Sequence, residues 1–473
     1  MSQTVSQDAG QARATPGDAQ ISAARLMAFA APCLPYSAVS IPLVVYLPGF
    51  YANVVGVPLA LVGLAFMLAR IGDVVVDPLL GGWMDQTRVR FGRFRLWSLI
   101  CAPILAVGAG ILFFPPKGAG FAWLAVGLGL TYLGYSTLIL AQMAWGSVLS
   151  SAYHGRSRVF GYWQNANVLG LIIAVALPVS AYMAGWRGPG VAVTSMGVFV
   201  LATLPVTIGL LTVFTPEPAP LEAASHRTPT DTLAAAFRLI RHPYAGRVIL
   251  ACLMFSLAPG VTGALFQFYF HVVRGLSSLS SNLLLLIYFI GGIVGTPFWT
   301  ALSRRIGKHG ALIGAAAYFS AFQFSIVLFP APSLVFANVL LFLAGLGYAA
   351  PVLLIRAMIA DAGDAIRLET GRDETGVLYA LINSTTKLGY ALAVGAAFPL
   401  LALVGFQPHE GAANAKSALD GLAFAFLVPP VLFCGLGAAV MIRYPLTEEK
   451  HAAIQVALAA KLSKDTPDHA AHV

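Results

Sequence analysis

Long apolar segments separated by short polar loops recur along the whole chain. Each has at least about the 20 residues that an α-helix needs to cross the hydrocarbon core of a bilayer. The predicted spans are residues 26–52, 59–84, 96–114, 120–149, 161–183, 191–214, 248–273, 283–302, 311–329, 334–359, 377–404 and 422–442. The pattern therefore predicts an all-α membrane protein with twelve transmembrane helices.

The longest polar stretch between spans, residues 215–247, divides the twelve into six and six. We predict a six-helix bundle over 26–214, a linker over 215–247 with a helix at 231–241, and a second bundle over 248–443. The tails, 1–25 and 444–473, are polar. Since the first tail has no apolar core, we expect no cleavable signal peptide. Two bundles with a site between them are typical of transporters.

Composition supports the membrane class, because 58% of the residues are hydrophobic and 10% are charged, whereas soluble domains have about 25% charged residues. The four cysteines fall inside apolar segments without disulfide or metal-ligand spacing, so they are interpreted as packing residues. The net charge of +9 reflects Lys and Arg concentrated in alternate loops. That bias predicts cytoplasmic termini and a cytoplasmic linker, in a membrane of the bacterial inner type.

The second predicted span contains two acids, Asp73 and Asp77. A carboxylate at the centre of a membrane helix costs about 2.5–3.5 kcal/mol on insertion scales. The spacing of four places both acids on one helix face, and Arg70 lies on the same stripe. Structural pairing is one interpretation and an ion pathway is the other. Pro78 also frees the carbonyl of Val74, so the sequence offers several oxygens for a small cation.

Several short motifs accompany these acids. They are Val54-Val55-Gly56, Leu61-Val62-Gly63, Ala69-Arg70-Ile71 with Asp73 and Asp77-Pro78, Gly92-Arg93-Phe94, Trp145-Gly146 and Arg156-Ser157-Arg158, with Lys387 in the eleventh span. With them the chain resembles the major facilitator superfamily, and within it the glycoside–pentoside–hexuronide:cation symporters of the melibiose permease type. The resemblance covers nearly the whole chain.

The resemblance implies a cation-coupled symporter that works by alternating access. It implies that Asp73 and Asp77 bind the coupling cation, with the hydroxyl of Ser136. It also implies that Lys387 lies near the cation and substrate sites. Arg70, on the same stripe as the acids, and Lys387 are the predicted charge partners of the carboxylates. Asp85, Arg93 and Arg95 resemble the superfamily's gating loop, and an ordinary positive-inside loop is the alternative interpretation.

The substrate pocket departs from the sugar-transporting members of that family. Their charged pair on the first helix is replaced here by Tyr36-Ser37, and a fifth-helix arginine aligns with Trp163. The candidate pocket residues are Tyr36, Tyr135, Gln142, Trp163, Gln164, Asn165 and Asn383. Each has the alternative role of joining helix to helix. By resemblance the substrate is a small organic solute, sugar- or glycoside-like; the aromatic and amide character also suits an amphipathic lysolipid- or steroid-like molecule.

The coupling ion stays open between Na⁺ and H⁺, since Na⁺ needs a compact set of oxygen ligands and a proton needs one buried carboxylate. A non-transporting receptor on a transporter fold and an intramembrane aspartyl protease are the alternatives from other classes. For the protease, the sequence offers no acid deep in a second span. We expect a monomer that contacts lipid, substrate and cation, without enzymatic activity, resident cofactor, structural metal or nucleic-acid partner.

Overall fold

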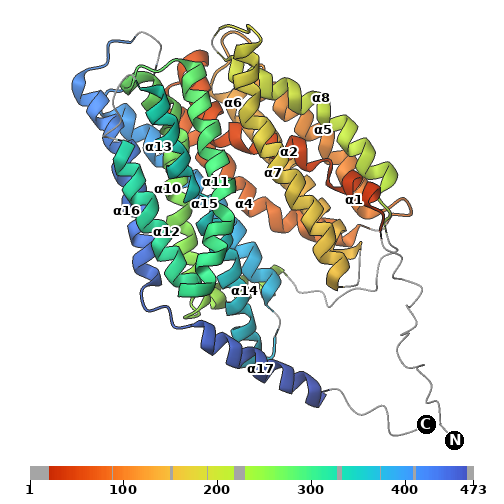
Figure 1. Ribbon diagram of the computed structural model, residues 1–473. Coiled ribbons are helices and arrows are strands. Elements are labelled where there is room, and N and C mark those ends of the chain that lie inside the picture. The colour runs from red at the N-terminus through yellow and green to blue at the C-terminus, as the bar shows by residue number, and fades with distance from the viewer. Residues whose placement is uncertain are drawn as a thin grey trace, which may run out of the picture.

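The computed structural model describes residues 21–465 apart from 88, 150–152, 189, 218–228, 327–332, 373 and 409–411. The described residues form helices and loops without strands. Two helical bundles lie side by side, the N-terminal one in red to yellow and the C-terminal one in green to blue (Figure 1). This agrees with the predicted fold class.

Six transmembrane segments build the N-terminal bundle. The first is a broken helix made of α1 (Ala23–Ala30), α2 (Cys33–Ile41), η1 (Pro42–Tyr46), α3 (Leu47–Phe50) and η2 (Tyr51–Val55), and the others are α4 (Leu59–Gln86), α5 (Arg93–Phe113), α6 (Phe121–Val148), α7 (Tyr153–Met183) and α8 (Val191–Phe214). The breaks coincide with prolines such as Pro42 and Pro48. Proline lacks the backbone N–H that a continuing helix requires.

Six more segments build the C-terminal bundle. They are α10 (Ala245–Phe268) continued by π-helical η3 (Tyr269–Val273), α11 (Ser278–Ile306), α12 (Lys308–Ser325), α13 (Leu334–Leu346) continued by α14 (Ala350–Thr370), α15 (Thr375–Leu403) and α16 (Lys416–Met441). Within the described ranges, eleven of the twelve segments are long and apolar enough to span a membrane. The remaining segment is α12, which begins with the polar residues Lys308 and His309. Residues 327–332, shortly after its end, are not among the described residues.

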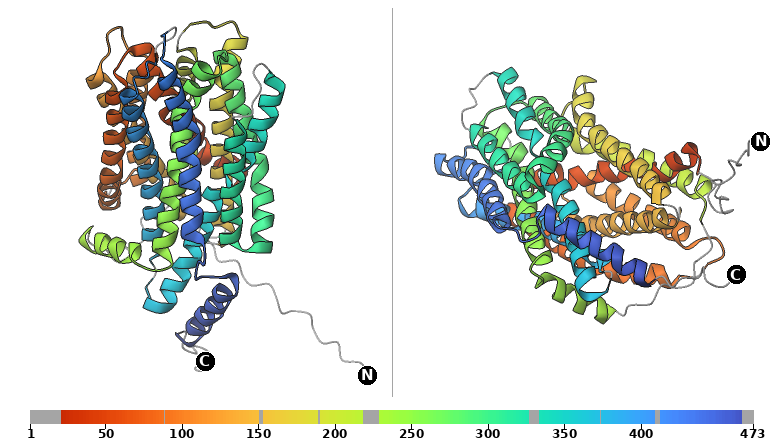
Figure 2. Two further views of the ribbon diagram at one scale, coloured as in Figure 1. Left: turned by 90° about the vertical axis from the view of Figure 1, so that its left-hand side faces the viewer. Right: turned by 60° about the horizontal axis from the view of Figure 1, so that its bottom comes forward.

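Two further helices lie at one end of the molecule, which we call the linker face; the opposite end is the far face. The helix α9 (Pro229–Ile240) follows the linker residues that lie outside the description, close to the helix predicted there. The helix α17 (Glu448–Asp465) was not predicted, and it packs against α14. The left view of Figure 2 shows α17 below the bundles and α9 extending sideways at their lower end. The four cysteines are buried, as expected of packing residues.

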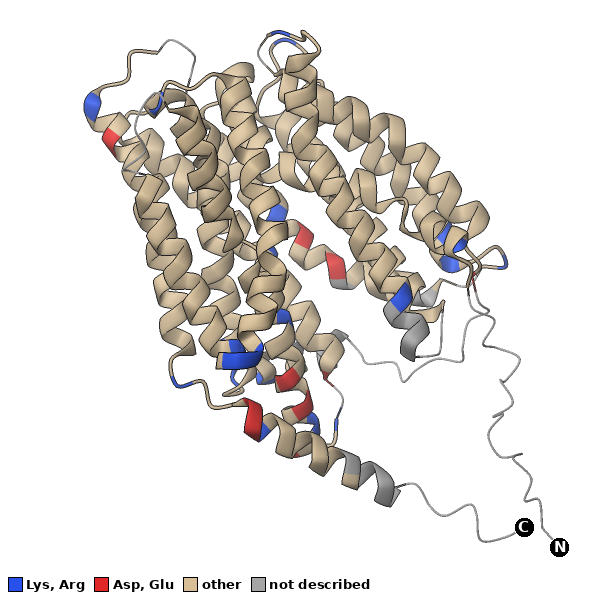
Figure 3. Cartoon of the chain, in the orientation of Figure 1, with Lys and Arg blue, Asp and Glu red and all other residues tan. Residues whose placement is uncertain are grey.

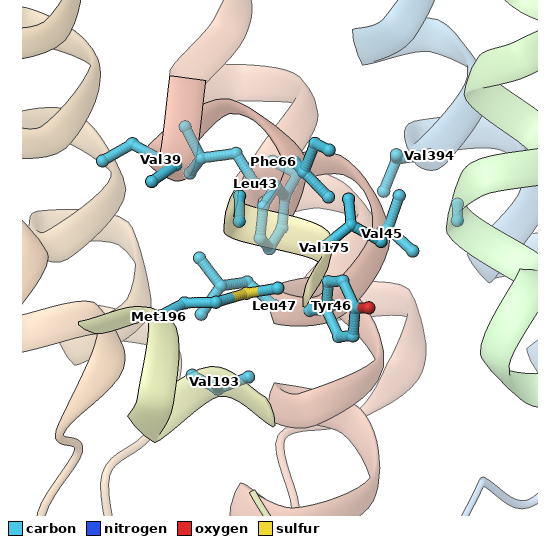
Figure 4. Packing of buried hydrophobic residues seen from close by; sticks show 14 of the residues in the cluster. Val39, Leu43, Val45, Tyr46, Leu47, Phe66, Val175, Val193, Met196 and Val394 are labelled. Atoms are coloured by element: carbon cyan, nitrogen blue, oxygen red, sulfur yellow. The ribbon is translucent and has the colours of Figure 1, made fainter. Parts of the chain in front are cut away.

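The bundles meet closely toward the far face. The helix α4 packs on α15, α7 on α11, and η1 on α10. A Cβ atom on Gly63 would lie 3.1 Å from Phe398 and Pro399, and one on Gly395 would lie 2.6 Å from the sulfur of Met67. Glycine at these two positions therefore lets α4 and α15 approach. Figure 4 shows Val394 of α15 directed toward Val45 of the N-terminal bundle.

The hydrophobic core follows the same division. One continuous cluster joins the N-terminal bundle to the far-face half of the C-terminal bundle, including Phe268, Phe398 and Phe426. A second cluster lies within the linker-face half of the C-terminal bundle and contains Leu239, Met358 and Tyr444. Apolar burial therefore holds the two bundles together at the far face.

Candidate functional site

The two membrane acids lie where α4 runs between the bundles. Figure 3 shows acidic positions in the middle of this helix, while most other charges gather at the ends of the molecule. The side chain of Asp73 is 2% exposed and that of Asp77 is 22% exposed. The spacing of four places them on one face, as predicted. Asp77 is one turn nearer the linker face, so it is the more accessible of the two.

Lys387 of α15 reaches both acids from the opposite bundle. Its ammonium lies 2.9 Å from Asp73 Oδ2 and forms a hydrogen-bonded ion pair with Asp77. It also donates to Ser136 Oγ at 3.0 Å. The three donors of the ammonium thus have three acceptors. Because α4 and α6 belong to one bundle and α15 to the other, this single side chain ties the two bundles together.

Ser136 completes the contact between α6 and the acids. Its hydroxyl donates to Asp73 Oδ1 while it accepts from Lys387. The side chain is buried, 6% of its residue surface being exposed. The structure therefore brings together Asp73, Asp77 and Ser136, the residues that the resemblance implied for the cation site, with Lys387, which was predicted as their charge partner.

Arg70 is the fifth member of this charged cluster. Its Nη1 donates to Asp73 Oδ2 at 3.2 Å, and its guanidinium lies over the ring of Tyr132, 4.5 Å from the centroid. Sequence reasoning missed Tyr132. Its position four residues before Ser136 places it on the same face of α6, which is the signal that would have found it.

Exposure along the two central helices shows on which side the site opens. On α4, exposure rises from Asp73 to Asp77 toward the linker face. On α15, Lys387 is buried while Asn383, one turn nearer the linker face, is exposed. Toward the far face the same helices are in tight contact through Gly63 and Gly395. The site is therefore closed toward the far face and accessible from the linker face.

Two of the candidate pocket residues bind each other. Gln142 is fully buried, and its Nε2 donates to the carbonyl of Phe29 at 2.6 Å. Its Oε1 accepts from the indole N–H of Trp163 at 3.0 Å and from the thiol of Cys33. Both polar groups of the amide are thus satisfied by the protein, which is the helix-joining role that membrane amides often have.

The other candidates are arranged differently. Tyr36 and Tyr135 make an edge-to-face pair with ring centroids 6.5 Å apart. The Tyr36 hydroxyl is buried and has no hydrogen-bond partner among the described residues. Gln164, Asn165 and Asn383 are exposed. The structure therefore gathers an aromatic pair near α6 and leaves three amides accessible, rather than bringing all seven residues to one point.

The predicted gating loop is tied to the start of the linker. Arg95 donates to the carbonyls of Phe91 and Thr215, while Glu217 accepts from the backbone N–H groups of Phe94 and Arg95 at 2.9 and 3.1 Å. The guanidinium of Arg93 lies over the ring of Phe94. The side chain of Asp85 lies outside the described part of the chain. Sequence reasoning missed Glu217, which caps the first turn of α5 although it lies 123 and 122 residues from the two residues that donate to it.

Comparisons with known proteins agree with this architecture. A family model described as MFS/sugar transport protein matches residues 28–448. The chain is 25% identical to the sphingosine-1-phosphate transporter MFSD2B of Mus musculus over 74% of each chain. It is 23% identical to the glucuronide carrier protein homolog of Escherichia coli (strain K12), covering 87% of this chain and 90% of the relative. The crystal structure of the nucleoside transporter NupG superposes with a TM-score of 0.66 at 13% identity, covering 92% of this chain and 99% of that one.

Proposed function

Because this chain belongs to the MFS/sugar transport protein family and is thus a membrane transporter, we propose that it is a cation-coupled symporter of a small organic solute. The coupling cation is Na⁺ or H⁺. Asp73 and Asp77 receive it, with Ser136 as a neutral oxygen ligand for Na⁺, and the carrier works by alternating access.

The observation that carries this proposal is the position of Lys387. Its ammonium lies between two carboxylates of the other bundle, where a coupling cation would lie. A cation that binds the carboxylates displaces the ammonium and breaks the ion pairs between the bundles. A change in cation occupancy thereby changes the free energy of moving one bundle against the other. Coupling of this kind is reciprocal, so cation and solute raise each other's affinity by the same factor.

One set of experiments distinguishes Na⁺ from H⁺ as the coupling ion and tests whether Asp77 belongs to the cation site. Thermal unfolding of the purified protein is measured in Na⁺, Li⁺ or choline salts and at several pH values. Uptake of any solute that binds is then measured in proteoliposomes under an imposed Na⁺ gradient or an imposed pH gradient. We expect one gradient to drive accumulation and Asp77→Asn to abolish it without loss of folding. The matched control is Asp420→Asn, an exposed acid at the start of α16. Accumulation that persists in Asp77→Asn would show that the cation binds elsewhere.

The solute is sugar- or glycoside-like by family, with an amphipathic molecule as the second candidate. The second candidate is favoured by the Gln142–Trp163 bond, because it removes polar groups with which a polyhydroxylated sugar would otherwise bond. The name of the MFSD2B relative points the same way. A binding screen of sugars, glycosides, lysolipids and steroids decides between them.

The linker face is cytoplasmic in this proposal, in agreement with the basic loops and with the position of α9 and α17 at one end. The structure then represents the inward-open conformation. Labelling of a single cysteine introduced at position 225 tests the orientation: labelling from the cytoplasmic side alone is expected, and labelling from outside alone would reverse it.

A further inference from the structure

Arg70 has more hydrogen-bonding capacity than the protein uses. A guanidinium carries five N–H donors, and within the described residues Arg70 makes one hydrogen bond, from Nη1 to Asp73. Its other face is occupied by the ring of Tyr132. The Arg70 side chain is 13% exposed. An arginine that is held by an acid and a ring and that has unused N–H donors is suited to bind a further planar or tetrahedral anion.

Arg70 lines a narrow cavity between the bundles. Its walls are apolar side chains such as Phe66 and Val394, together with the rings of Tyr132 and Tyr390. In this conformation it has room for about one water molecule. The cavity lies next to the contact of Gly63 and Gly395 that closes the far face. Separation of α4 from α15 at that contact would widen the cavity into a larger chamber.

Charge counting shows what such a chamber would hold. Asp73 and Asp77 carry two negative charges, and Arg70 and Lys387 carry two positive ones, so the cluster is neutral as it stands. One monovalent cation added to the carboxylates leaves a net charge of +1. A net charge in a low-dielectric interior is unfavourable, and a monovalent anion from the solute would cancel it.

We propose, on the basis of the symport function above, that the transported solute is an organic anion whose carboxylate or phosphate binds Arg70. Its apolar or ring portion lies against Tyr132 and Tyr390. The solute enters when the far face is open, and Arg70 is the specificity residue for its charge. Cation and solute then depend on each other because only the pair leaves the cluster neutral.

Two matched pairs of probes test this. One pair is p-nitrophenyl β-D-glucuronide and p-nitrophenyl β-D-glucoside, which differ at the carboxylate. The other is 1-oleoyl lysophosphatidic acid and 1-oleoylglycerol, which differ at the phosphate. In Na⁺ or at the coupling pH, the anionic member of at least one pair should bind at least about tenfold more tightly than its neutral partner, since hydrogen bonds to charged groups are the stronger ones. The responding pair distinguishes a sugar acid from a lysolipid. Equal binding within both pairs, or no binding at all, overturns the proposal.

The variants Arg70→Gln and Arg70→Lys assign the effect to this side chain. We expect the first to lose the preference for the anion and the second to retain part of it. Arg274→Gln is the control, because Arg274 also lies over a tyrosine ring, that of Tyr269, but at the far face. A preference that survives in Arg70→Gln contradicts the assignment.

The net charge that moves with the solute can be measured directly on the unmodified protein. If the glucuronide enters with one cation, its uptake should be electroneutral in a solid-supported membrane recording, and a sustained inward current would overturn the charge argument. Failure of the symport proposal looks different. In that case neither Na⁺ nor acid changes thermal stability, and the anion binds equally well without them.

Discussion

The molecule contains two clusters of ion pairs that differ in place and in consequence. The central cluster of Arg70, Asp73, Asp77, Ser136 and Lys387 lies between the bundles. The linker-face cluster consists of the pairs Lys308–Asp361, His451–Asp364, His242–Glu369 and Arg238–Glu374. The acids at the centre are 2% and 22% exposed, whereas Lys308 and Arg238 are 39% and 54% exposed.

The clusters also differ in which parts they join. The central one links α4 and α6 to α15 across the two bundles. The pairs of the linker-face cluster join the linker helix, the C-terminal bundle and α17. A change in the central cluster therefore alters the balance between conformations, while a change at the linker face alters local attachment. Similar contacts thus have different roles because of where they lie.

The largest expected effect comes from Lys387→Met. Removal of the ammonium leaves two buried carboxylates with Arg70 as their remaining cation, and breaking a buried pair in this way costs about 3–5 kcal/mol. We expect a large loss of thermal stability at neutral pH in choline salts. If the carboxylates bind Na⁺, added Na⁺ should restore much of it. Thermal unfolding of the purified variant measures both.

Lys308→Met is the matched substitution in the linker-face cluster. Lys308 is substantially exposed, so water replaces its partner and the change should be about 0–1 kcal/mol, without any recovery in Na⁺. If the two variants lose the same stability, the distinction between the clusters is wrong.

A smaller effect is expected from Ser136→Ala. This removes one hydrogen bond to Asp73 and one acceptor for Lys387, and an unsatisfied buried polar group costs about 1–3 kcal/mol. If the ion is Na⁺, its affinity should fall; if it is H⁺, coupling should persist. Ser195→Ala is the control: Ser195 has the same exposure, 6%, but bonds the carbonyl of its own helix at Ala192. Equal effects of the two changes would mean that Ser136 acts only on packing.

The two clusters also differ in how far the sequence predicts them. Asp73 and Asp77 can be identified from the sequence because a charged side chain in an apolar span is energetically costly and therefore indicates a functional site. Lys387 can be identified in the same way. The linker-face acids sit in polar segments, where charge is ordinary. Their partners His451 and Arg238 lie 87 and 136 residues from the acids that they contact, so no local pattern predicts the pairing.

The elements of the fold likewise differ in how far local sequence determines them. Spans follow from local hydropathy, and the bundle division follows from one long polar stretch. The helix α17 lacks such a signal because its mostly apolar stretch, residues 452–460, is too short to span a membrane, although Thr447 accepts from Lys450 N–H at its start. The hydrogen bond between Gln142 and Trp163 could not be predicted for a different reason. Both residues are equally suited to line a substrate pocket, and only the packing of α6 on α7 determines that they bond to each other instead.

The smallest effect should follow Asp361→Asn. Asp361 holds Lys308 at the start of α12 and lies 3.6 Å from His451 of α17, so its loss weakens the attachment of α17 to α14. The global stability should change by about 0–1 kcal/mol, because Lys308 stays solvated. Hydrogen–deuterium exchange should rise over residues 448–465 and stay constant in α15. Glu369→Gln serves as control, since Glu369 also lies on α14 but pairs with His242 of the linker side. If Asp361→Asn accelerates exchange in α15 or abolishes transport, the linker-face cluster is part of the transport machinery and the two clusters do not differ in role.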